Sequence, residues 1–137
     1  MRADFINKYL SKNKIDREQY KLLTSQRKAT DVLGRGGEAL YGLYSENDTL
    51  LYLGYARNLA NRIGSHFNGN TNTGHFSYRV KYARYTYELD EIRSAYDRIV
   101  QKTHPDIEIW DIEFFAIKLL RPIYNREKAE HLIFRRI

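Results

Sequence analysis

The chain has no cysteine among its 137 residues, so disulfide bonds and cysteine-ligated zinc sites are excluded and nothing indicates an oxidising compartment. It has no apolar run of the about 20 residues that a membrane span needs, so we expect no membrane association. The first residues, MRADFINKYLSKNK, lack the continuous apolar stretch of a secretory signal peptide. Internal repeats and low-complexity segments are also absent. These absences favour a cytoplasmic protein.

Basic residues outnumber acidic ones, with 23 lysines and arginines against 17 aspartates and glutamates, which gives a net charge of +6. Excess positive charge favours polyanionic partners such as DNA, although the same charges can simply keep a protein in solution. The 12 tyrosines also allow two interpretations, because a tyrosine ring can stack on a base and can equally pack at the edge of a strand. A chain of this length fits one domain with a core of its own.

The N-terminal part of the chain has helical spacing. Apolar residues between positions 3 and 32 recur at helical intervals in two pieces, with a break near Asn13-Lys14. The glycine-rich stretch at positions 34 to 37 ends this region, because clustered glycines stop helices. We therefore expect residues 1–37 to form an N-terminal helical extension that packs on the same domain as residues 38–137.

Alternating apolar residues predict a small sheet after this extension. The runs 39–44 and 50–55 read as two strands joined by a hairpin turn, and a third strand is expected at Phe76–Tyr82. Helical spacing predicts three further helices at 57–67, 88–101 and 107–120, and Pro122 stops the last of them. The fold class that these elements predict is α+β, with a small three-stranded antiparallel sheet flanked by helices.

Three polar residues stand out on the predicted helices. Arg62 and His66 are four positions apart, so they share one helical face and can act on one site. A guanidinium matches phosphate oxygens in a bidentate manner. Glu113 lies in an apolar helix, where a carboxylate is costly unless it is paired or binds a cation such as Mg²⁺. Taken singly, Arg62 and His66 are better explained as a solvated basic face, and Glu113 could pair with Lys118 or a neighbouring arginine on the surface.

The hairpin carries a known pattern when its residues are taken with those that follow. Ala39-Leu40-Tyr41 and Tyr52-Leu53-Gly54 are two triplets separated by ten residues. Further residues then follow in a fixed order: Arg62, His66, Glu113, Pro122 and Asn125. In this order and spacing, over roughly residues 38–125, the chain resembles the GIY-YIG nuclease family.

Two tyrosines could be the first tyrosine of this pattern, one favoured by the spacing between the triplets and the other by the identity of the residues in the triplet. Gly42-Leu43-Tyr44 is closer in letters to the Gly-Ile-Tyr triplet of the family, but only seven residues separate it from the second triplet. Tyr41 keeps the ten-residue spacing and is the residue that we favour, with Tyr44 as the alternative. Ala39 departs from the glycine of the family.

The resemblance implies a nuclease that depends on Mg²⁺ or Mn²⁺. It assigns the metal to Glu113, phosphate stabilisation to Arg62, and activation of water to Tyr41 with His66 as its hydrogen-bond partner. Two residues have supporting roles: Tyr52 would orient the phosphate, and Asn125 would support Glu113 or the local backbone.

DNA is the partner that the resemblance implies. Four basic residues near the predicted sheet edge and helix start are candidates for DNA contacts: Arg57, Arg79, Lys81 and Arg84. The His66 and Asn125 matches favour the restriction-endonuclease branch of the family. Cleavage of both strands needs two active sites, and so a homodimer or two successive nicks. The alternative class is a non-catalytic basic module that only binds nucleic acid.

Overall fold

The computed structural model describes residues 2–33, 37–69, 74–99, 113, 116–117 and 120–125. Most of the predicted helix 107–120 and three residues of the glycine-rich stretch lie outside these residues. Within the described part, no helix has the length and apolarity that a membrane crossing needs.

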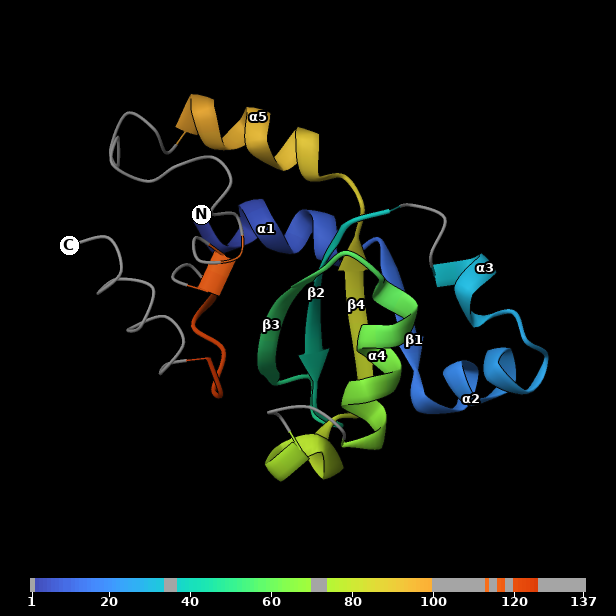
Figure 1. Ribbon diagram of the computed structural model, residues 1–137. Coiled ribbons are helices and arrows are strands. Elements are labelled where there is room, and N and C mark those ends of the chain that lie inside the picture. The colour runs from blue at the N-terminus through green and yellow to red at the C-terminus, as the bar shows by residue number, and fades with distance from the viewer. Residues whose placement is uncertain are drawn as a thin grey trace.

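A four-stranded antiparallel sheet is the centre of the fold (Figure 1). Its strands, in spatial order, are β1 (Asn13–Asp16), β4 (Tyr82–Thr86), β2 (Ala39–Tyr44) and β3 (Leu50–Ala56). The α+β class with a small antiparallel sheet is thus confirmed, and the sheet has one strand more than the sequence predicted.

The additional strand β1 comes from the N-terminal segment, between helix α1 (Arg2–Leu10) and helix α2 (Arg17–Ser25). The sequence predicted two helical pieces with a break near Asn13-Lys14, and the strand, which was not predicted, lies at this break. Only Ile15 of the four β1 residues is buried, so the run shows no alternation that could reveal a strand. Pairing with β4, in which Ile15 lies opposite Ala83, makes it one.

The strand predicted at Phe76–Tyr82 was also wrong. Residues Gly74–Arg79 form a 3₁₀ helix, η1, and the strand β4 begins only at Tyr82. Phe76 and Val80 are buried and four positions apart, whereas Tyr78 between them is 81% exposed. The two buried residues are four positions apart, as on one face of a helix, and the residue midway between them is exposed. In a strand all three would lie on the same face.

The hairpin formed by β2 and β3 is confirmed. Its register places Tyr41 opposite Gly54 and Leu43 opposite Tyr52. The register then shifts, because Tyr44 pairs with Leu50 and leaves Leu51 as the additional residue of a β-bulge. Side chains of directly opposed residues lie on the same face, so Tyr41 and Tyr52 project to the same side of the sheet.

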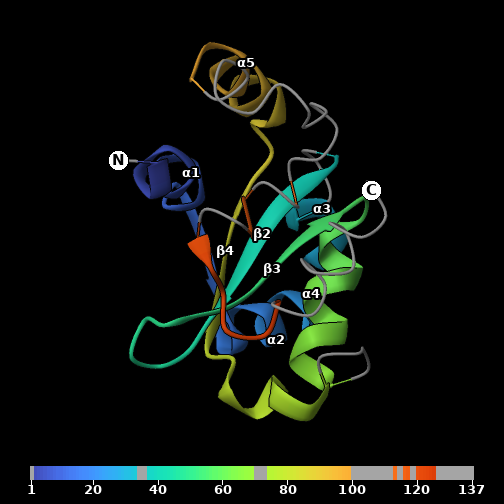
Figure 2. The same ribbon diagram turned by 90° about the vertical axis from the view of Figure 1, so that its left-hand side faces the viewer.

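Helices cover both faces of this sheet, which Figure 2 shows with α4 on one side and α1 on the other. Helix α4 (Leu59–Asn68) follows β3 directly and packs with α2 and α3 (Ala29–Leu33) on the face of Tyr41. On the opposite face, apolar residues of α1 and α5 (Leu89–Ile99) pack on Leu40 and Leu53. The predicted helices 57–67 and 88–101 are thereby confirmed to within two residues.

Helix α4 has defined ends. The Asn58 side chain accepts a hydrogen bond of 3.1 Å from the Asn61 backbone N–H, which satisfies a donor of the first turn. Gly69 ends the helix in the left-handed conformation at φ 73°. The helix is therefore fixed at both ends directly after the hairpin, and its buried stripe of Leu59, Ile63 and Phe67 faces the sheet.

Candidate active site

A hydrogen bond between Tyr41 and His66 forms the buried centre of the site. Tyr41 lies in the middle of β2, and its phenol oxygen Oη is 2.6 Å from Nε2 of His66 in the last turn of α4. Each of the two side chains is only 1% exposed. The structure therefore brings together the two residues that the sequence proposed as partners.

Gly54 provides the space in which this phenol lies. A Cβ atom at position 54 would be 2.3 Å from Tyr41 Oη and 2.4 Å from Cζ, distances that real Cβ atoms do not show. The Tyr41 ring thus crosses its cross-strand neighbour, and any side chain at position 54 would displace it. Tyr41 of the first triplet therefore fits only because position 54 of the second triplet is glycine. The sequence reasoning missed this dependence.

Tyr52 completes an aromatic cluster with these two residues. Its ring centroid lies 6.3 Å from that of Tyr41 and 5.3 Å from that of His66. Phe76 of η1 packs on the other side of Tyr52 at 6.1 Å. Tyr52 is half-buried, so this ring connects the buried pair to the surface.

The electrostatic environment keeps Tyr41 protonated. Burial raises the pKa of Tyr41 well above its usual value of 10, and the charges of Tyr52 and Glu113 act in the same direction. The positive charge of Arg62 lowers this pKa. A neutral phenol can donate its proton to His66 Nε2. Arg62 and Glu113 both act electrostatically on Tyr41, although they come from distant parts of the chain.

Arg62 lies at the surface beside this centre. It lines an open groove of about 410 Å³ whose walls are Tyr55, Arg57, Asn58, Asn61, Arg62 and Ser65. Neither arginine makes an ion pair with a described residue. The groove therefore presents two available guanidinium groups among neutral polar side chains, and this combination suits a phosphate ligand.

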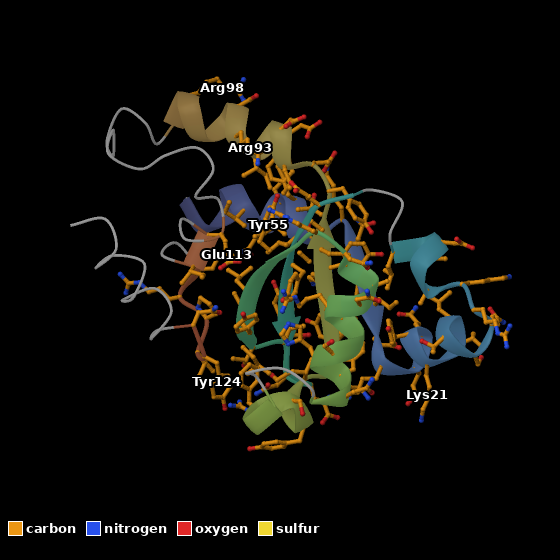
Figure 3. The ribbon with its side chains drawn as sticks, in the orientation of Figure 1. Lys21, Tyr55, Arg93, Arg98, Glu113 and Tyr124 are labelled. Carbon is orange, nitrogen blue, oxygen red and sulfur yellow. The ribbon has the colours of Figure 1, made fainter. Side chains whose placement is uncertain are left out.

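Glu113 approaches from the other side of the hairpin. Figure 3 shows it on the helical segment alongside the β3 edge of the sheet. Its side chain is half-buried, and its charge contributes to the raised pKa of Tyr41. Among the residues that the structure describes, no group of three or more metal-ligating side chains gathers. One carboxylate suits Mg²⁺, which usually keeps several waters and takes its remaining ligands from substrate phosphate.

Asn125 fixes the segment that follows Glu113 to the sheet. Its fully buried side chain accepts a hydrogen bond of 2.6 Å from the Leu53 backbone N–H and donates one of 2.9 Å to the Leu53 backbone oxygen. The Tyr124 N–H also donates to the Leu51 oxygen at 2.9 Å. Asn125 thus replaces a missing neighbour strand at the open edge of β3. It supports the backbone and does not line the groove of Arg62.

The alternative first tyrosine, Tyr44, lies on the opposite face of the sheet. Its ring stacks on Tyr82 with centroids 5.1 Å apart, and its side chain is 8% exposed. Lys14 and Arg84 lie over the Tyr82 ring at 4.2 and 5.5 Å. Tyr44 belongs to this stack and makes no contact with His66, whereas Tyr41 does.

The four candidate DNA contacts do not form one surface. Arg57 lies in the groove beside Arg62. Arg79, the last residue of η1, donates a hydrogen bond of 2.8 Å to Tyr124 Oη, and Figure 3 shows Tyr124 near the lower end of the β3 edge. Arg84 is on the face of Tyr44, where it donates to the Ser11 oxygen at 3.4 Å. Lys81 is exposed between these two places.

Two residues of the N-terminal segment reach α4, and the sequence reasoning did not select either for the site. Arg17 donates to the backbone oxygen of Phe67 at 2.6 Å, and Tyr20 donates to that of Ala60 at 3.0 Å. A half-polar helix with an arginine in its first turn and a tyrosine three residues later was the only available signal. Both contacts depend on the tertiary position of α2.

Comparisons with known proteins agree with this geometry. Residues 38–128 match the family model of the GIY-YIG catalytic domain. The chain is 38% identical over 86 residues to UvrABC system protein C of Stenotrophomonas maltophilia strain R551-3, and 38% identical over 90 residues to the protein of the same name from strain K279a.

Each of these two matches covers 63% of this chain and 12% of the relative. No solved structure matches the chain significantly. The family match covers more than half of the chain and includes the hairpin, α4, Glu113 and Asn125. The chain therefore belongs to the GIY-YIG nuclease family, and the domain that it carries is a GIY-YIG-type endonuclease domain.

Proposed function

We propose that this protein is a metal-dependent endonuclease that hydrolyses phosphodiester bonds of DNA. The observation that carries the proposal is the buried Tyr41–His66 hydrogen bond, on which the charges of Arg62 and Glu113 both act. Hydrolysis of a phosphodiester needs an activated water, stabilisation of charge at phosphorus and a route for protons. Each of these requirements has a candidate residue beside the pair.

Arg62 binds the scissile phosphate in this proposal. Its guanidinium is exposed in the groove and makes no ion pair with a described residue. The groove also contains Arg57, so the DNA backbone passes along the start of α4 with one phosphate at each arginine. Asn61 and Ser65 line the same groove and offer neutral donors.

Tyr41 and His66 move the proton of the attacking water. Because burial raises the pKa of Tyr41, a resting tyrosinate is not available as the base. The phenol accepts the proton of water while it gives its own proton to Nε2 of His66, 2.6 Å away. Tyr52, whose ring packs on both, orients the phosphate.

Glu113 holds the divalent cation, Mg²⁺ or Mn²⁺. The partly buried carboxylate fits a cation because it lies in a mostly apolar stretch of sequence and acts on the same phenol as Arg62. When bound, the cation neutralises charge on the phosphate. Asn125 keeps the chain after Glu113 on the edge of β3.

The biological role is the finer part of this proposal. We retain restriction-type cleavage by a homodimer and a cytoplasmic location as predictions from the sequence. The two curated relatives are both named UvrABC system protein C, and this chain spans 12% of their length. A protein that only binds nucleic acid would use the same groove, and cleavage experiments distinguish the two functions.

The test is cleavage of supercoiled plasmid in Mg²⁺ by the wild type and two variants, Arg62→Ala and Glu113→Gln. We expect the wild type to nick or linearise the plasmid and each variant to be slower by about 10²–10³-fold, the usual effect of removing a transition-state contact. Arg98→Ala and Glu91→Gln on α5, both exposed and neither lining the groove, are the matched controls and should cleave as the wild type does.

Chelation of the divalent metal should stop cleavage, and its restoration should recover it. Cleavage that survives in both Arg62→Ala and Glu113→Gln would refute the proposed centre. Binding of DNA without cleavage in any metal would support the non-catalytic module.

A further inference from the structure

The N-terminal segment Asn13–Ser25 contacts the helix that carries Arg62 and His66 through directional polar groups. It precedes the residues 38–128 that match the family. Helix α2 within it has no fully buried residue, and only Tyr20 and Leu23 pack in part against the hydrophobic core. Its contacts with α4 involve Arg17 and Tyr20, each of which donates to a backbone oxygen of that helix.

Arg17 of α2 connects the end of α4 with η1 and with the residue Val80 that follows η1. Its Nε donates to the Val80 oxygen at 2.6 Å, one terminal nitrogen donates to the Phe67 oxygen at 2.6 Å, and the other donates to the Ser77 oxygen. The guanidinium also lies over the Phe67 ring, 5.0 Å from its centroid. Phe67 is in the last turn of α4, where a positive charge is favourable to the helix dipole.

This connection involves residues beside the catalytic pair. Phe67 directly follows His66 in the chain, and Ser77 directly follows Phe76, whose ring packs on Tyr52. Among the described residues Arg17 makes no ion pair, so its charge is satisfied by the backbone oxygens alone. A lysine cannot reproduce this arrangement, since it has one nitrogen where the guanidinium has three.

Tyr20 contacts the first two turns of α4. Its hydroxyl donates to the Ala60 oxygen at 3.0 Å, and its ring packs edge-on against Phe67 with centroids 5.6 Å apart. The ring reaches the helix only because position 64 is glycine, where a Cβ would be 2.3 Å from Tyr20 Oη. Gly64 lies between Arg62 and His66, so this contact occurs at the part of α4 that carries the site.

We propose that residues 13–25 form a brace that fixes the position of α4, and that Arg17 and Tyr20 are positioning residues for Arg62 and His66. The effect of this brace on the cleavage rate rests on the proposed nuclease function. Neither Arg17 nor Tyr20 touches DNA in this proposal. Both act through the backbone of α4.

The closing experiment combines two substitutions in the full chain, Gly64→Ala and Tyr20→Phe. Gly64→Ala pushes the phenol away, so we expect kcat to fall about 10- to 100-fold, as for a misplaced catalytic group. In the Tyr20→Phe background the hydroxyl is absent and the nearest remaining ring atom is 3.0 Å away. There the same glycine substitution should cost about threefold or less in kcat, because the hydroxyl that would clash with the new methyl group is gone.

Arg17→Lys tests the other contact. We expect kcat to fall about tenfold with an unchanged KM for DNA, since the positive charge remains and the geometry is lost. Lys21→Ala is the matched control, because this basic residue is exposed on the same helix (Figure 3). A raised KM with an unchanged kcat in Arg17→Lys would instead make Arg17 a DNA contact and overturn the brace.

A second readout does not require cleavage. The imidazole nitrogen signals of His66 in long-range ¹H–¹⁵N spectra report its hydrogen bond with Tyr41 in the free protein. We expect these signals to shift in Gly64→Ala and Arg17→Lys, and not in Lys21→Ala. If the wild type cleaves no DNA, the proposed function fails and these signals still decide the brace. Unchanged signals and unchanged kcat in both variants would overturn it.

Discussion

At the scale of single residues, strand geometry decides which tyrosine belongs to the site. Tyr41 and Tyr44 are three positions apart in one strand, an odd separation that sends their side chains to opposite faces. Tyr41 therefore meets His66, whereas Tyr44 stacks on Tyr82. The two residues have the same chemistry, and their environments give them different roles.

The dependence of Tyr41 on Gly54 gives a first prediction. Gly54→Ala places a methyl group where the phenol lies, so the Tyr41–His66 hydrogen bond must break. We expect cleavage to slow by about 10²-fold or more and the free energy of unfolding to fall by about 1–3 kcal/mol from overpacking. Plasmid cleavage rates and urea unfolding measure the two effects.

Gly42→Ala is the matched control for this substitution. Gly42 lies in β2 of the same hairpin, on the face of the sheet opposite to that of Gly54. A Cβ there would be 3.0 Å from Leu50 Cδ1 and from Tyr44 Cε1, which are ends of side chains that can move. We expect a small loss of stability and normal cleavage. A Gly54→Ala protein as active as Gly42→Ala would contradict the role of Tyr41.

At the scale of elements, the open edge of β3 is closed by a side chain. β3 is the last strand of the sheet, and Asn125 provides both hydrogen bonds that a neighbouring strand would give to Leu53. An amide side chain can do this because it carries a donor and an acceptor at the spacing of a peptide group. Asn125 thus joins the chain after Glu113 to the hairpin of Tyr41.

Asn125→Asp tests this closure through its pH dependence. The carboxylate still accepts from the Leu53 N–H but faces the Leu53 oxygen without a donor. Burial favours the protonated acid, which can donate, so the folded-state pKa lies above the unfolded one. The variant is therefore nearest to wild-type stability at low pH and loses stability as pH rises through the folded pKa.

We expect the loss at neutral pH to be about 2–4 kcal/mol, from one broken hydrogen bond and one buried charge. Thermal unfolding of both proteins at about pH 5 and about pH 8, spanning the range in which a buried aspartate ionises, gives the comparison. Asn58→Asp, at the exposed N-cap of α4, should show no such trend, because aspartate is as good a cap as asparagine. An equal loss for Asn125→Asp at both pH values would contradict the donor role.

At the scale of the whole molecule, the tyrosines make the fold sensitive to alkali. Burial raises the pKa of Tyr41, Tyr44, Tyr55, Tyr82, Tyr85 and Tyr87. For Tyr44 and Tyr87 the pKa rises to about 12. These residues lie on both faces of the sheet, so their ionisation affects the whole core.

The sign of the effect follows from these pKa shifts. Above a pH of about 10 an unfolded tyrosine releases its proton, whereas folded Tyr44 keeps it until about 12. Stability is therefore complete below the unfolded pKa and falls as pH rises from about 10 to about 12, by about 1.4 kcal/mol per pH unit for such a residue. Urea unfolding at several pH values across this range should show the decline.

Tyr44→Phe isolates one of these residues. The described residues give the Tyr44 hydroxyl no hydrogen bond, so the variant should keep wild-type stability at neutral pH. Its decline above a pH of about 10 should be less steep by about 1.4 kcal/mol per pH unit. Tyr78→Phe, at a side chain that is 81% exposed, should decline as the wild type does. Identical slopes for all three proteins would contradict the burial effect.

The sequence by itself determined the local elements and the order of the site residues. The hairpin and α4 were predictable because their signals are local: alternation, a polar turn, then a helical stripe after Asn58. The choice of Tyr41, Arg62, His66 and Glu113 as candidate site residues followed from their spacing along the chain, and so did the resemblance to the family.

Only the tertiary structure decided the contacts between distant segments. Strand β1 exists because β4 pairs with it, and the Gly54 and Gly64 positions accept the Tyr41 and Tyr20 rings from other elements. Asn125 reaches Leu53 across 72 positions of chain. Such contacts leave no periodic trace in the sequence, since they depend on packing in three dimensions, and they hold the site residues in place.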